Sequence, residues 1–128
     1  MAGEIQGLHV NFAEIAADTT EEWYAAIPWP GTWKLVKAYL TSMTARTAHA
    51  TNYVTVTLKK STTSIAAFST DTATTDDLVA GTPVELAITG TGTDLEFAQG
   101  TAIGIHKTDP GTGLALDGSV DMCFEQVR

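Results

Sequence analysis

The sequence is short of positive charge and of long apolar runs. It has 7 Lys and Arg against 15 Asp and Glu, so the formal net charge is −8 at pH 7. Nucleic-acid binders depend on clustered Lys and Arg, and anionic membranes attract the same residues. No apolar run approaches the roughly 20 residues that span a bilayer. We therefore expect neither nucleic acid nor a membrane among the partners.

Cysteine is also scarce. The single residue, Cys123, excludes a disulfide within the chain, and a lone cysteine in an apolar run is usually a small buried residue. The first residues, MAGEIQGLHVNF, lack the basic segment followed by an apolar one that marks a secretory signal. Both features predict synthesis in a reducing cytoplasm.

Charged residues make up only 17% of the chain, against about a quarter in ordinary domains, and threonine is abundant. Threonine is β-branched and suits a pleated, half-exposed surface. Short runs of alternating apolar and polar residues recur between Gly, Pro, Asn, Asp and Thr, which predicts strands joined by turns. The runs are LHVNF (8–12), TWKLVKAYL (32–40), YVTVTLKK (53–60), SIAAF (64–68), PVELAIT (83–89), AIGIHK (102–107) and SVDMCFEQV (119–127).

This pattern predicts an all-β fold, an antiparallel β-sandwich of about eight strands that is jelly-roll-like, with an extended N-terminal arm. An immunoglobulin-like sandwich is the alternative. Residues 1–22 are predicted as the arm or first strand, and residues 23–128 as a single sandwich domain. In the run 32–40, strict alternation places Val36, Ala38 and Leu40 on one face and Trp33, Leu35 and Tyr39 on the other, and a helix is the alternative for this run. The same alternation turns Val84, Leu86 and Ile88 inward in the run 83–89. In the run 119–127 it places Val120, Met122 and Phe124 on one face, opposite Asp121, Cys123 and Glu125. STDTATTDD (69–77) is predicted as an exposed loop.

An aromatic cluster occupies a segment in which Pro28 and Pro30 forbid a central strand. Three roles are open: covering one end of the core, anchoring an interface, for which Trp and Tyr are enriched, or stacking on a carbohydrate. We predict that the cluster and the apolar residues of the N-terminal segment form an interface. These residues are Ile5, Leu8, Val10, Phe12, Trp23, Tyr24, Trp29 and Trp33.

Residues that could carry catalysis or hold a metal are scattered along the chain. His9, His49 and His106 lie in distant segments, and none has a second ligand at metal-site spacing. No nucleophile, phosphate-loop or HExxH motif is present. We therefore predict no enzyme activity, no catalytic residue, no cofactor and no metal. Calcium stays an open alternative because Asp109 and Asp117 lie in turns.

The order of the segments resembles that of the small β-sandwich decoration, or cement, proteins of tailed-bacteriophage capsids. A short N-terminal segment precedes the aromatic and proline stretch, and TNYVTVTLKK (51–60) leads to a Thr-rich loop and the turn VAGTP (79–83). The region GTDLEFAQGTAIGIHKTDPGTG (92–113) follows, with a Gly-x-x-Leu…Gly…Ile cadence. The resemblance covers residues 32–125.

This resemblance implies a structural virion protein on the capsid exterior, made in the host cytoplasm. Its expected partners are the major capsid protein and two further copies of itself in a homotrimer, and it would stabilise the shell by bridging neighbouring capsid subunits. The alternative is a receptor-binding or carbohydrate-binding domain of a phage head fibre or tail fibre.

Overall fold

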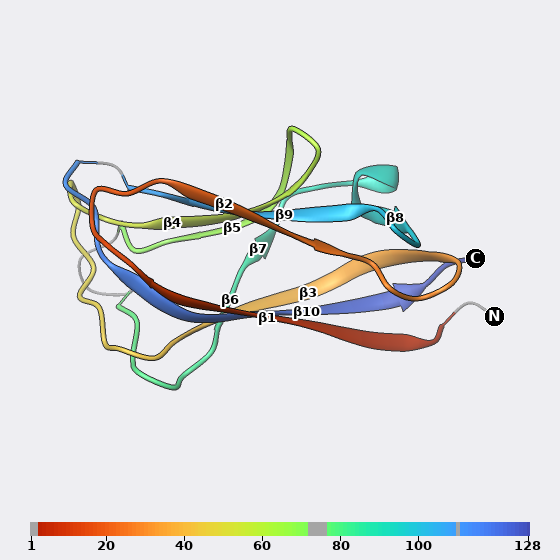
Figure 1. The fold of residues 1–128 in the computed structure, drawn as a ribbon, viewed down its shortest axis with the longest axis horizontal. Coiled ribbons are helices and arrows are strands. Elements are labelled where there is room, and N and C mark those ends of the chain that lie inside the picture. The colour runs from red at the N-terminus through yellow and green to blue at the C-terminus, as the bar shows by residue number, and fades with distance from the viewer. Residues whose placement is uncertain (1–2, 72–76, 110) are drawn as a thin grey trace.

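Two antiparallel sheets pack face to face in the computed structural model, which describes residues 3–71, 77–109 and 111–128 (Figure 1). We call them sheet A, with strand order β1-β10-β3-β6 and β8 also paired to β3, and sheet B, with order β2-β9-β4-β5-β7. The prediction of an all-β antiparallel sandwich is confirmed. The jelly-roll-like path stays a prediction.

The strands of sheet A are β1 (Ile5–Ile15), β3 (Thr32–Ser42), β6 (Val84–Glu85), β8 (Glu96–Ala98) and β10 (Leu116–Gln126). Those of sheet B are β2 (Glu21–Ala26), β4 (Thr55–Lys60), β5 (Thr63–Ser69), β7 (Ala87–Ile88) and β9 (Ala102–Thr108). A single-turn 3-10 helix, Gly92–Leu95, precedes β8. Over the described ranges, no helix has the length and apolar character needed to cross a membrane.

The core lies between the sheets and is built by strand alternation. In β10, Val120, Met122 and Phe124 are buried, as predicted, because successive side chains of a strand point to opposite faces. Cys123 lies between two of them in sequence, so it faces outward and is half-buried rather than part of the core.

The faces predicted for residues 32–40 are wrong. Trp33 and Leu35 share the core face with Ala38 and Leu40, although strict alternation puts the two pairs on opposite faces. The pairing of β3 with β10 shifts register and skips Val36. A β-bulge adds one residue to one strand and reverses the alternation beyond it, so both halves of β3 turn their apolar side chains inward.

Residues 83–89 pass from one sheet to the other. β6 pairs with β3 of sheet A, and β7 pairs with β5 of sheet B. Leu86 lies between them with its side chain fully buried, and its N–H donates to the carbonyl of Ala38 at 2.9 Å. Val84 and Ile88 are half-buried against the core, so the predicted inward face of this segment is confirmed.

The N-terminal segment belongs to both sheets. Residues 5–15 form β1 and pair with β10, and residues 21–26 form β2 and pair with β9. Residues 1–2 of the predicted arm, residues 72–76 of the predicted Thr/Asp loop and Pro110 of the DPGTG turn lie outside the described residues.

Candidate interface at the open edge of the sandwich

The strands β1 and β2 are edge strands of different sheets on the same side of the molecule (Figure 1). Residues 16–20 connect them, so the chain leaves sheet A and enters sheet B at one end of this side. Phe12 of β1 and Trp23 of β2 meet across the gap, with ring centroids 5.0 Å apart. We call this side, formed by residues 5–26, the open edge.

Along the open edge, the outward backbone groups of β1 have no hydrogen-bond partner among the described residues. The N–H of Gln126 donates to the carbonyl of Glu4 at 2.8 Å, so Glu4 points its carbonyl toward β10. Direction alternates along an antiparallel strand. The N–H and C=O groups of Gly7, His9 and Asn11 therefore point away from sheet A, in the plane where a further strand would pair.

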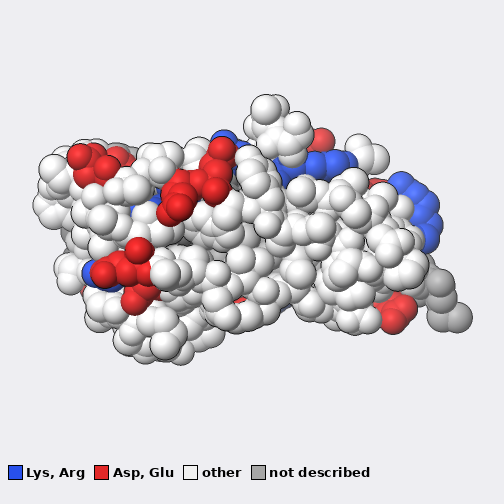
Figure 2. Space-filling model, in the orientation of Figure 1, with Lys and Arg blue, Asp and Glu red and all other residues white. Residues whose placement is uncertain are grey.

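The open edge is acidic where β1 turns into β2. Glu14, Asp18, Glu21 and Glu22 are exposed there, and Arg46 pairs with Glu14 at 3.1 Å. In Figure 2, the red acidic side chains on this face gather mainly over that end, and blue Lys and Arg side chains gather toward the opposite end. Acidic side chains therefore predominate on this side near the connection between β1 and β2 (Figure 2).

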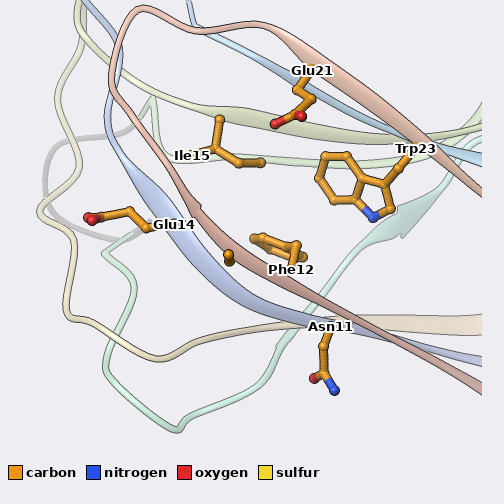
Figure 3. Close-up of a pocket in the computed structure, with 7 residues that line it drawn as sticks. Asn11, Phe12, Glu14, Ile15, Glu21 and Trp23 are labelled. Carbon is orange, nitrogen blue, oxygen red and sulfur yellow. The ribbon is translucent and has the colours of Figure 1, made fainter.

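A hollow of about 400 Å³ lies between the two edge strands. Phe12, Ile15 and Trp23 line it from β1 and β2, and Figure 3 shows the side chain of Phe12 turned toward Trp23 across the gap, whereas Glu14 points away from it. The indole Nε1 of Trp23 is enclosed and finds no hydrogen-bond partner among the described residues. An enclosed donor without an acceptor costs free energy.

A buried lysine fixes the connection between the two edge strands. The Lys107 ammonium donates to the carbonyls of Ala16 at 3.1 Å and Thr19 at 3.0 Å, and it forms an ion pair with Asp109. Asp109 also accepts hydrogen bonds from the backbone N–H groups of Thr19 at 3.0 Å and Leu114 at 3.3 Å. All three donors of the ammonium are used, so the buried charge is compensated.

Sequence reasoning missed this lysine. Lys107 continues the inward series of Ile103 and Ile105 in β9, and its side chain is fully buried. A charged residue at an inward position of a strand is the signal that could have identified it.

The open edge contains five of the eight predicted interface residues and brings four of them together. Leu8, Val10 and Phe12 are half-buried on the inner face of β1, and Trp23 faces them from β2. Ile5 lies at the start of the same strand and is 54% exposed.

The other three predicted interface residues lie elsewhere. Tyr24 is 64% exposed and lies on the outer face of sheet B, with its ring against Gly104. Trp29 packs against Trp33, with ring centroids 5.2 Å apart, and Trp33 is only 2% exposed, with its Nε1 donating to the carbonyl of Pro30 at 2.9 Å. Trp33 therefore belongs to the core and has no surface to offer a partner, which corrects the predicted interface at this residue.

Titratable pairs lie on the outer faces of the sheets. His9 of β1 contacts Asp121 of β10. The hydrogen bond that the imidazole donates to Asp121, the one that it donates to the Asn11 side-chain oxygen, and the charge of Asp121 raise the pKa of His9 above its ordinary value. On sheet B, His106 lies 3.7 Å from Glu22. Within the described ranges, no group of three His, Cys, Asp or Glu side chains is placed to hold a metal ion.

The aspartates that left calcium open are engaged in contacts within the chain. Asp109 binds Lys107, as described above. Asp117 accepts a hydrogen bond from the Thr44 hydroxyl at 3.0 Å and lies 3.6 Å from Arg46. Comparison of the chain with family models, curated proteins and solved structures finds no match.

Proposed function

We propose that this protein is a structural binding module that attaches through its open edge to a larger protein assembly. The observation that carries this proposal is the exposed backbone of β1 beside the half-buried Phe12 and Trp23. Backbone groups of this kind pair with further strands, and aromatic side chains are enriched where proteins bind one another. The fixed turn at residues 16–20 keeps the two edges in place without a partner.

The assembly that we propose is a tailed-bacteriophage capsid, with this protein as a decoration protein on its outer surface. The resemblance in segment order over residues 32–125 supports this choice. A module of 13.5 kDa gains avidity when several copies act together, so a homotrimer that bridges neighbouring capsid subunits fits a small contact per copy.

Particles produced by the genome that encodes this chain test the proposal. Gold-labelled antibody raised against the chain should mark the heads of intact particles and should not mark particles from which the gene has been deleted. The heads of particles that lack the protein should also rupture at a lower temperature than those of intact particles. Label confined to the tails would refute capsid decoration, and so would particles that carry no label.

A second candidate is a carbohydrate-binding fibre domain, and Tyr24 is the observation that favours it. Its exposed ring lies on the outer face of sheet B, against Gly104 and beside Glu22, whose carboxylate lies 3.5 Å from the Tyr24 hydroxyl. Sugars stack on exposed aromatic rings beside hydrogen-bonding groups. A glycan array should then give a signal that Tyr24→Ala abolishes, whereas Tyr39→Ala, on the outer face of the other sheet, should leave it unchanged.

A further inference from the structure

We propose that β1 binds an extended, lysine- or arginine-bearing segment of a partner protein as an added strand of sheet A. This inference rests on the proposed attachment through the open edge, but it does not depend on which assembly the protein joins. Strand addition is a common mode of recognition, in which the backbone supplies affinity and alternate side chains supply specificity.

The first argument is that β1 lacks most of the features that usually protect an edge strand from pairing. Proteins usually protect long edge strands with lysine, proline, a bulge or a covering loop. β1 contains no Lys, Arg or Pro, and its pairing with β10 is regular from Ile5 to Phe12, with a register shift only between Phe12 and Ile15. The N–H and C=O groups of Gly7, His9 and Asn11 therefore form an unprotected row that a strand can pair with.

The second argument is the apolar surface beside that row. Leu8 and Val10 pack against the core from the inner face of β1, but both stay partly exposed because β1 is the last strand of sheet A. Inward side chains of an added strand would cover them. A side chain further along the added strand would reach the hollow beside Phe12 and Trp23.

The third argument is charge, and it selects the partner. Glu14 and Glu21 are exposed and line the hollow, Asp18 is exposed in the connection between β1 and β2, and the whole chain carries a net charge of −8. A basic strand is attracted to this edge. A second copy is disfavoured at this edge, because an antiparallel β1–β1 pairing centred on His9 would set Glu4 of one copy opposite Glu14 of the other.

The test uses the full chain, labelled with nitrogen-15, and the probe peptide acetyl-Lys-Val-Thr-Val-Lys-Val-Thr-Val-Lys-amide. We expect the amide signals of Gly7, His9 and Asn11 to shift on titration and to exchange with solvent more slowly in the complex. The amide signals of strands inside sheet B, such as that of Thr57 in β4, should keep their positions. Shifts spread over both sheets would overturn the assignment.

Two control peptides separate strand pairing from charge attraction. The same peptide with N-methyl groups on alternate residues keeps its charge but cannot pair, and it should bind at least tenfold more weakly. A peptide with Glu in place of Lys should also lose at least tenfold. Equal binding of the N-methylated peptide would overturn the proposed strand addition.

A matched pair of variants tests the edge itself. His9→Pro removes one outward N–H, at an edge position where proline is tolerated, and His9→Thr keeps that N–H and serves as its control. We expect binding at least tenfold weaker for His9→Pro than for His9→Thr, and equal binding by the two folded variants would contradict the proposal. Glu21→Gln, an exposed substitution that leaves the fold intact, should weaken binding at low salt, and no change would overturn the charge argument.

Two further outcomes separate this inference from its alternatives. In sedimentation of the free chain, we expect no dimer that the His9→Pro substitution abolishes. A dimer of that kind would show that a second copy of the chain, and not a basic partner segment, pairs with β1. Peptide binding without label on phage heads would leave strand addition standing and remove capsid decoration. Label on heads without peptide binding would do the reverse.

Discussion

Lys107 is the residue whose replacement should most sharply reveal how the open edge is held. Its ammonium is fully buried and bonded to two carbonyls of the connection between β1 and β2, and to Asp109, whose side chain is 2% exposed. Lys107→Met keeps most of the side-chain volume but removes the charge. The variant leaves the Asp109 carboxylate buried without its cation.

The expected loss is large for a domain of this size. Removing one partner of a buried ion pair costs about 3–5 kcal/mol, because the remaining charge is uncompensated. A natural domain has about 5–15 kcal/mol of stability in total. With a urea dependence of about 2 kcal/mol per M, the unfolding midpoint of Lys107→Met should fall by roughly 2 M with an unchanged slope.

Urea unfolding followed by tryptophan fluorescence measures this loss, since Trp23, Trp29 and Trp33 all report on the sandwich. Lys107→Met combined with Asp109→Asn should be more stable than Lys107→Met alone, because the amide carries no charge. Lys37→Met, at an exposed position of β3, is the control and should change stability by no more than about 0.5 kcal/mol. A loss below about 1 kcal/mol for Lys107→Met would refute the reasoning.

Three further measurements test the fold and the outer face. Gly118→Ala should lose more than about 1 kcal/mol in a thermal melt, because Gly118 has φ +136° and a Cβ there would lie 1.9 Å from the carbonyl oxygen of Thr41; an unchanged melting temperature would contradict that close approach. Phe124→Ala should lose about 3–5 kcal/mol on urea unfolding through the cavity left between the sheets, and a loss like that of a surface substitution would place Phe124 outside the core. An NMR titration should give His9 a pKa above its ordinary value that falls back in Asp121→Asn; because the pKa is raised in the folded state, this contact stabilises the protein below the ordinary histidine pKa, and the stabilisation is lost as the pH rises through the folded value. Identical titration curves for the two proteins would show that Asp121 does not act on His9.

Capsid attachment and strand addition make separate demands on the open edge. Attachment requires only that some surface of the sandwich contacts a partner, whereas strand addition requires the outward backbone of Gly7, His9 and Asn11. In Lys107→Met, residues 16–20 would no longer be anchored to β9, so β1 would be held less firmly. The variant should therefore bind the peptide more weakly even in molecules that remain folded.

The alternation of side chains was enough to predict most of the strands and many of their faces, although β2 was not among the predicted strands. In residues 119–127 and 83–89 the alternation of apolar and polar side chains correctly predicted what is buried, because a strand has a period of two and one face of each sheet lies against the core. The same alternation in residues 8–12 singled out Leu8, Val10 and Phe12, which are half-buried at the open edge. The aromatic content of residues 23–33 singled out Trp23, which contacts Phe12 there.

Which of these side chains meet depends on how the strands pair and the sheets pack. The bulge that skips Val36 depends on how β3 pairs with β10, and it moved Trp33 from the predicted interface into the core. Phe12 and Trp23 belong to strands of different sheets, so their contact depends on how the sheets stack. The role of Lys107 depends on carbonyls 88 and 91 residues away in the chain. Such contacts arise from packing between distant segments, and local periodicity carries no information about them.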